Sequence, residues 1–124
     1  MINRIFRRLF KAVIVIIIMI IGYSFLNKYL KQDAINTSLS RMKNRQISGV
    51  VFEKYLDSSN HLVKTINIEL DNSKHCDITV PLEKSGFFNF IQIGDSIFKD
   101  KNSLMIVIVR KDTVINYSLK YDIK

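Results

Sequence analysis

The sequence predicts a mainly β fold with one N-terminal transmembrane helix, and three observations lead to this fold class. The first is an apolar run near the N-terminus, residues 12–26, with basic residues on both sides. The second is a change from helical to alternating apolar spacing after residue 46. The third is a length of 124 residues, which allows one small domain with an appendage and excludes eight-stranded β/α barrels and doubly wound nucleotide-binding sheets.

The net charge of +8 lies entirely in the first 46 residues. These residues include nine Lys or Arg and one acid, Asp33, whereas residues 47–124 contain ten basic and ten acidic residues. A neutral domain lacks the basic groove that nucleic-acid binding needs, so we expect no nucleic-acid partner. The single cysteine excludes an internal disulfide, and with two histidines it leaves no zinc-finger spacing, so we expect no metal and no cofactor.

Residues 1–30 are predicted to form a basic cytoplasmic tail and the membrane anchor. A helix from Leu9 to Leu30 is about 33 Å long, enough for a hydrocarbon core of about 30 Å. Lys11 and Lys28 then lie near its two ends, where long basic side chains reach the headgroups. The alternatives are a cleaved signal peptide, with Gly22-Tyr23-Ser24 as its cleavage site, and a buried core helix.

The orientation of the anchor follows from the basic residues that flank it. Arg4, Arg7, Arg8 and Lys11 form a dense cluster, whereas the basic residues after the span are spread out. The positive-inside rule therefore predicts a cytoplasmic N-terminus and an exported C-terminal domain. The Ile-, Lys- and Asn-rich composition is typical of an AT-rich bacterial genome, so we expect a single-pass protein of the bacterial inner membrane, in contact with the lipid bilayer.

Residues 31–46 are predicted to continue the helix as a basic stalk. The segment contains no Pro or Gly, so it is not a flexible linker. The spacing of its apolar residues places them on one helical stripe with two leucines of the anchor. This stripe consists of Leu26, Leu30, Ile35, Leu39 and Met42. It would rest on the domain or on lipid; a self-association seam is the alternative.

Residues 47–124 are predicted to form the small β-domain, which begins with three strands. Residues 47–56 read as the first strand, in which Gly49 allows a bulge or a close backbone approach. Residues 62–70 alternate most regularly and form the second strand. The third strand places Cys76, Ile78, Val80 and Leu82 on its inward face, and Pro81 marks its end or an edge position.

A short helix and two more strands complete the predicted domain. The apolar residues of 87–93 fit one or two helical turns, which Gly94 closes. Residues 104–109 are continuously apolar, as expected for a central strand buried on both faces, and residues 114–121 alternate again. Three strands, a helix and two strands is the element order of a five-stranded OB-like barrel. An SH3-like barrel and a curled antiparallel sheet with a helix are the alternatives.

No complete catalytic constellation is present in the sequence, so we expect the protein not to be an enzyme. Gly94-Asp95-Ser96-Ile97 resembles the nucleophile block of the GDSL esterases, but no histidine follows His75 to serve as base. Ser96 and Lys99 could form a serine–lysine dyad of the kind that bacterial signal peptidases use, but the proline-containing motif of those enzymes is missing. His75 and Cys76 are adjacent, so in a strand they point to opposite faces and cannot readily share a metal ion.

Three stretches of the domain are similar to known motifs: Ser48-Gly49-Val50-Val51, the Asn60-His61 turn, and residues 90–99 with Asn102-Ser103. Together they resemble small membrane-anchored β-domain proteins found in Bacteroidota. The resemblance covers most of residues 47–110. It implies no particular activity, and no catalytic residues carry over.

The function expected from the sequence is that of a binding or assembly module at the cell envelope, with another envelope protein as partner and the oligomeric state open. The candidate interaction surface comprises the Asn60-His61 turn, the segment that contains Asp95, Ser96 and Lys99, and any uncovered face of the barrel. The alternatives are a small envelope hydrolase that uses Ser96 and Lys99, and an accessory subunit of a membrane complex whose helix is the active part.

Overall fold

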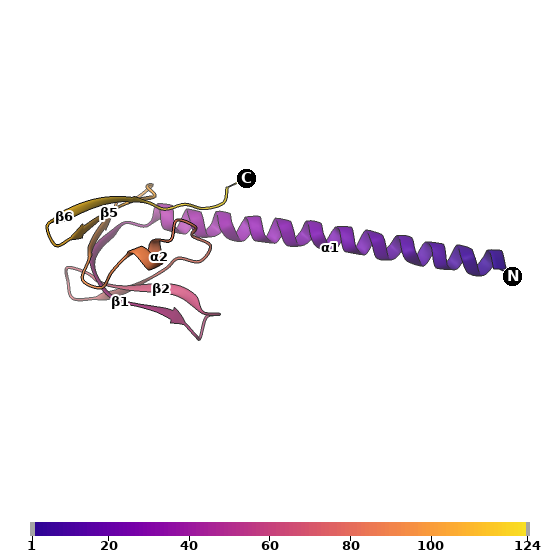
Figure 1. The fold of residues 1–124 in the computed structure, drawn as a ribbon, viewed down its shortest axis with the longest axis horizontal. Helices are drawn as coiled ribbons and strands as arrows, with labels where there is room; N and C mark the ends of the chain where they lie inside the picture. The colour runs from indigo at the N-terminus through magenta and orange to yellow at the C-terminus, as the bar shows by residue number, and fades with distance from the viewer. Residues whose placement is uncertain (1, 124) are drawn as a thin grey trace. The chain divides into compact units, whose positions relative to one another are not determined.

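The structure is a computed structural model, and it describes residues 2–123. The chain divides into two compact units, Met1–Ala34 and Ile35–Lys124. One long helix, α1 (Ile2–Asn44), forms nearly all of the first unit and contributes its last ten residues to the second (Figure 1). The absence of Pro and Gly after residue 22 of this helix is consistent with its continuity.

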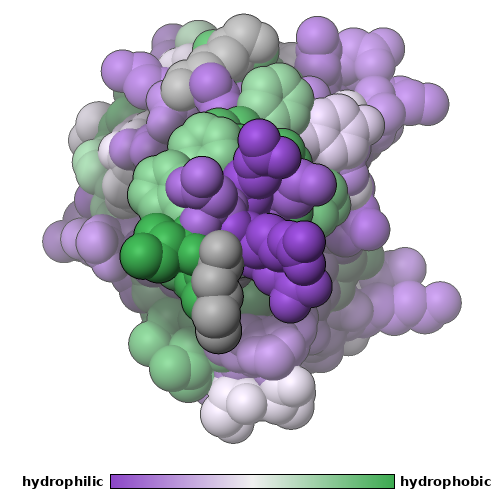
Figure 2. Space-filling model, turned by 90° about the vertical axis from the view of Figure 1, so that its right-hand side faces the viewer, coloured by the Kyte–Doolittle hydropathy of each residue, from purple (hydrophilic) through white to green (hydrophobic). Residues whose placement is uncertain are grey.

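The first unit presents an apolar helix without a protein cover. Its most apolar window is entirely exposed, and by length and composition the helix could cross a membrane, a test that a signal sequence also passes. Arg4, Arg7, Arg8 and Lys11 are exposed before the apolar run of residues 12–26, and Lys28 is exposed after it. Where the N-terminal end of the chain faces the viewer, strongly hydrophilic side chains lie beside hydrophobic ones (Figure 2).

The second unit is built on an antiparallel sheet of six strands in the order β3-β2-β1-β4-β5-β6. Its elements are β1 (Ile47–Asp57), β2 (Val63–Glu69), β3 (His75–Thr79), α2 (Phe87–Phe90), β4 (Ser96–Lys99), β5 (Met105–Arg110) and β6 (Thr113–Ser118). The predicted position of the short helix, after the third strand, is confirmed, although α2 has only four residues. The expected five-stranded barrel, OB-like or SH3-like, is wrong, because the sheet has six strands and β3 and β6 end it without pairing to each other. An antiparallel sheet with a helix, the alternative to a barrel, is what the structure shows.

The strand that the sequence did not reveal is β4. It has four residues, and Ile97 is inward while Ser96 and Phe98 point outward. The second inward position is Lys99, and an ammonium at a core position hides the alternation that marks a strand. β4 pairs with both β1 and β5, so it joins the first three strands to the last two strands of the sheet.

Two features of β1 adapt it to its central place. Gly49 lies on the inner face, where an added Cβ would come within 2.4 Å of the carbonyl oxygen of Glu69. The predicted close backbone approach at this glycine is therefore confirmed. Between Val51 and Glu53 the register with β2 shifts, so Phe52 is the extra residue of a bulge.

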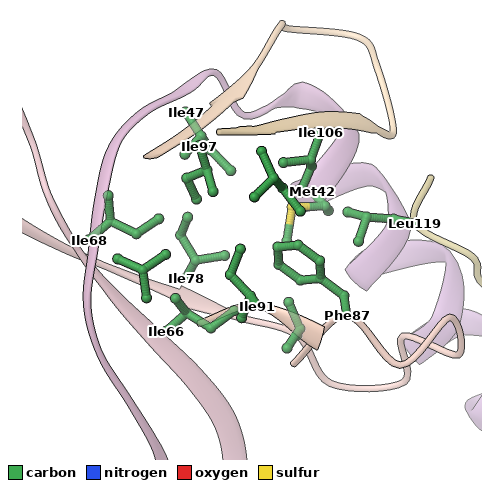
Figure 3. Close-up of a cluster of buried hydrophobic side chains, with 13 residues drawn as sticks. Met42, Ile47, Ile66, Ile68, Ile78, Phe87, Ile91, Ile97, Ile106 and Leu119 are labelled. Carbon is green, nitrogen blue, oxygen red and sulfur yellow. The ribbon is translucent and has the colours of Figure 1, made fainter. Parts of the chain in front are cut away.

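One face of the sheet, called the inner face below, carries the core. Its side chains are mainly isoleucines of β1, β2, β3, β4 and β5, and they meet Phe87 and Ile91 from the α2 segment and Leu119 after β6 (Figure 3). Met42 joins the same cluster from the last turn of α1, and Ile35 is also buried. The inner face is therefore covered by the end of α1 and by α2.

Candidate functional site

The residues singled out from the sequence fall at three different kinds of position. Asn60 and His61 lie in the turn between β1 and β2, and both are exposed. The turn is fixed by the backbone N–H groups of Asn60 and Leu62, which donate to the carbonyl oxygen of Asp57 over 3.1 and 2.8 Å. His61 and Leu62 have positive φ angles, which tighten the loop. This turn is available for contact with a partner.

Asp95, in contrast, is an internal ion-pair residue. The residue is about 2% exposed, and its two carboxylate oxygens accept hydrogen bonds from the Arg110 guanidinium over 2.9 and 2.7 Å. The backbone N–H of Gln92 donates to the same carboxylate over 2.9 Å. The hydrogen bonds from Arg110 lower the pKa of Asp95 despite its burial, so the carboxylate stays ionised. These bonds give Asp95 a structural role that the sequence did not reveal.

Lys99 is also buried, at about 2% exposure, and its ammonium closes the end of α1. The Nζ group donates to the backbone carbonyl oxygens of Lys43, Arg45 and Asp100. The last carbonyls of a helix have no partner within the helix, and a lysine is a suitable donor for them. Burial lowers the pKa of Lys99, which the nearby Asp100 carboxylate partly offsets.

The structure does not bring Ser96 and Lys99 together as a catalytic pair. They lie three residues apart on β4, so their side chains point to opposite faces of the sheet. Ser96 is opposite Val50 and Val109 on the outer face, whereas the Lys99 ammonium is held by three carbonyl groups on the inner side. A serine–lysine mechanism requires the amine within hydrogen-bond reach of the hydroxyl, and this arrangement does not provide it.

His75 and Cys76 point to opposite faces of β3, as expected for adjacent residues of a strand. Cys76 is half-buried on the inner side, where the Arg45 guanidinium donates to its sulfur. On the outer face, the His75 ring lies 4.8 Å from the Phe52 ring, edge to face. Among residues 2–123, no group of three or more His, Cys, Asp or Glu side chains is placed to hold a metal ion.

A polar network surrounds His75 on the outer face of β1, β2 and β3. The Asn67 amide donates to the Asp77 carboxylate over 2.7 Å, and Tyr55 Oη donates to the same carboxylate over 3.3 Å. The Asn67 oxygen is therefore turned toward His75, whose Nδ1 lies 2.8 Å away and donates to it. The network satisfies its members mutually and fixes the polar surface of these strands.

The other half of the outer face is apolar. On this half of the sheet β1 pairs with β4, β4 with β5, and β5 with β6. On each strand, the side chains that alternate with the core residues point outward. We call this surface the apolar outer face. Its apolar members are Val50, Phe98, Met105, Val107, Val109 and Val114. Phe98 and Met105 are each 46% exposed and Val114 is 65% exposed, which is unusual for clustered large side chains.

This surface differs from the sequence-based expectation for residues 104–109, which was a strand buried on both faces. Ile106 and Ile108 are buried as expected, but Met105 is exposed. Burial on both faces requires a covering layer on each side, and the described part of Ile35–Lys124 supplies only the end of α1 and α2, both on the inner face. Apart from the anchor, the sequence predicts only a stalk and one short helix. So few helices can cover only one face of a sheet, and this is the signal that could have identified the uncovered face.

A small cavity of about 70 Å³ lies between the end of α1 and the end of β3. It is lined by Ser38, Arg41, Met42, Arg45, Thr79 and Pro81. Pockets that hold organic ligands are usually about 300–1,000 Å³, so this cavity is too small for such a substrate. This cavity is therefore set aside as a ligand site, and the apolar outer face is the candidate binding surface.

No protein-family model, curated protein or solved structure matches the chain. The function therefore has to be inferred from the residues of the chain itself. What the geometry offers is an exposed apolar sheet face and an exposed turn. Apolar surface patches of this kind are typical of the places where proteins contact one another.

Proposed function

We propose that the protein is a single-pass, membrane-anchored β-domain that acts as a binding or assembly module at the bacterial cell envelope. The single observation that carries this proposal is the apolar outer face, where six apolar side chains of four adjacent strands lie together and no element in the described part of Ile35–Lys124 covers them. Exposed apolar patches of this kind mark surfaces that bind other macromolecules. The apolar helix α1 supports the membrane part of the proposal.

The placement of the protein in the envelope follows from its charges. The basic cluster before the apolar segment favours a cytoplasmic N-terminus, so the sheet domain would lie on the exported side of the inner membrane. The electrically balanced domain favours a protein partner over nucleic acid. The resemblance of its motifs to anchored proteins of Bacteroidota is consistent with this location.

Membrane fractionation and a topology reporter test the anchor. The full-length chain should remain in the membrane pellet after alkaline carbonate extraction. Alkaline phosphatase fused after Lys124 should be active, and a reporter that fluoresces only in the cytosol should be dark. A soluble full-length chain would contradict anchoring, and a fluorescent cytosolic reporter would contradict the proposed orientation.

Site-specific photo-crosslinking in native membranes tests the binding surface. A photoreactive amino acid in place of Phe98 should give a reproducible protein adduct, because Phe98 is in the middle of the apolar outer face. The matched control is Thr79, which is exposed on β3 and opposite Thr65 in the sheet. Equal labelling from both positions, or none from Phe98, would contradict binding through the apolar outer face.

A further inference from the structure

The apolar outer face carries no charged side chain at all. Its positions on β1, β4, β5 and β6 are the six apolar residues, three serines and Asn116. In this chain 24% of all residues are charged, so ten neighbouring outward positions on four strands without a charge are unexpected. A partner recognised by complementary charge would require charges here, and none is present.

The adjacent half of the outer face has the opposite character. Glu53, Glu69 and Asp77 lie on it, in register with Asn67 and His75. This acidic strip borders the apolar outer face along β1. Anionic lipid headgroups would be repelled by the strip, so the charge pattern does not favour a bilayer surface as the occupant.

We propose that a second copy of this chain covers the apolar outer face, with the two sheets packed face to face around a two-fold axis. An uncharged face meets its own copy without like-charge repulsion. An axis that runs along the strands between β4 and β5 places β1 of one copy over β6 of the other, because the strand order is β1-β4-β5-β6. The acidic strip of each copy then extends past the β6 edge of its partner.

The other in-plane two-fold axis, perpendicular to the strands, would place the two acidic strips directly opposite each other. Glu53, Glu69 and Asp77 of one copy would face the same residues of the other, and this like-charge contact is unfavourable. The charge pattern therefore selects the axis along the strands. With this axis, Phe98 of each copy lies next to the axis and close to its counterpart.

This inference names the partner of the surface given under the proposed function, and so it rests on that function. The membrane anchor supports it, because two chains held in one membrane meet at a high effective concentration. The two proposals can nevertheless fail separately. Carbonate extraction tests the anchor, and the oligomeric state tests the partner.

The test introduces a positive or a negative charge at Phe98 in the full-length chain. The oligomeric state is measured for the protein purified in mild detergent and by crosslinking in native membranes. The wild type should be a dimer. Phe98→Lys and Phe98→Asp should each be monomeric, and a mixture of the two should form a heterodimer. Thr79→Lys, on the other edge of the sheet, should remain dimeric. Because Phe98 is 46% exposed, both variants should keep the far-UV circular dichroism spectrum of the wild type.

Three results would overturn the proposal. They are a monomeric wild type in both detergent and native membranes, a dimer that Phe98→Lys leaves intact, and crosslinks from position 98 that lead only to a different protein. If both Phe98 variants fail to fold, Val114→Asp provides the same test, because Val114 is 65% exposed and in the proposed dimer lies over Val50 of the other copy, beside its Glu69. A dimer that persists in a folded Val114→Asp variant would also overturn the proposal.

Discussion

Asp95 and Arg110 form a two-point ion pair that joins β5 to the segment before β4. Arg110 Nε lies 2.9 Å from Asp95 Oδ1, and Arg110 Nη2 lies 2.7 Å from Asp95 Oδ2. The same guanidinium donates to the carbonyl oxygen of Phe90 over 3.0 Å and lies 5.1 Å from the Phe90 ring centroid. Arg110 therefore connects β5 both to the end of α2 and to the segment before β4, so this pair stabilises the packing of α2 on the inner face.

Asp95→Asn should destabilise the sheet domain at neutral pH. The asparagine keeps the shape but loses the charge, so the buried end of Arg110 is left without its counter-ion. Breaking a fully buried pair costs about 3–5 kcal/mol. The Arg110 side chain is 25% exposed, so we expect a smaller loss of about 2–3 kcal/mol in the free energy of unfolding. Thermal unfolding of the full-length protein in detergent measures it, with the exposed Asp112→Asn as control; equal Tm values for the two variants would contradict the role of the pair.

The contribution of this pair should also depend on pH in the acid range. Arg110 holds the pKa of Asp95 below its ordinary value of 3.8, so the unfolded chain takes up a proton at a higher pH than the folded domain. The stabilisation is complete at a pH above the pKa of Asp95 in the unfolded chain. It is lost as the pH falls through the lower pKa of Asp95 in the folded domain. The stability gap between wild type and Asp95→Asn should therefore narrow from pH 7 to pH 2.5. A gap that stays constant over this range would show that the carboxylate charge is not its source.

The alternating patterns of the sequence predict the longer strands well. Ile66 and Ile68 on β2, and Ile106 and Ile108 on β5, are buried as their spacing indicates. Each of these strands has two isoleucines at successive inward positions, and the period of two is then sufficient to identify them. The end or edge position that Pro81 indicated for the third strand agrees with β3 at one edge of the sheet. The sequence does not show, however, that the sheet stays open, because pairing between distant strands leaves no local signal. For this reason barrel closure was predicted and an open sheet is found.

The candidate site was less predictable for a related reason. Asp95 and Lys99 are charged residues in a turn-like segment, and such residues are mostly exposed. Here each has partners that lie elsewhere in the sequence, Arg110 for Asp95 and the carbonyl groups of Lys43 and Arg45 for Lys99. Only the exposed Asn60-His61 turn lies where the local composition indicated. The apolar outer face depends on which elements cover the sheet, and a periodicity within one strand does not contain that information.

Lys99→Met should weaken the attachment of the helix end to the sheet domain. Methionine has a similar length but no donor, so the carbonyl oxygens of Lys43 and Arg45 lose a hydrogen bond from a charged group. A buried acceptor left without a partner costs about 1–3 kcal/mol of stability. Part of this loss is offset, because the variant no longer has to bury a charged ammonium. We expect a lower Tm and faster amide hydrogen exchange at residues 41–46, whereas the exposed Lys101→Met should change neither. Unchanged exchange in Lys99→Met would contradict its capping role.

Gly49→Ala should be the most damaging single-methyl change in the domain. The new Cβ would lie 2.4 Å from the Glu69 carbonyl oxygen and 2.6 Å from Ile68 Cγ2, and the first of these atoms belongs to the backbone of the neighbouring strand. To make room, β1 must move away from β2 at the centre of the sheet. Overpacking of this kind costs about 3 kcal/mol or more, a fall in Tm of roughly 10–20 °C for a domain of this size. Gly22→Ala is the matched control, because nothing lies within 4 Å of its added Cβ. A Gly49→Ala protein as stable as Gly22→Ala would show that β1 and β2 are not as closely packed at this point as the structure places them.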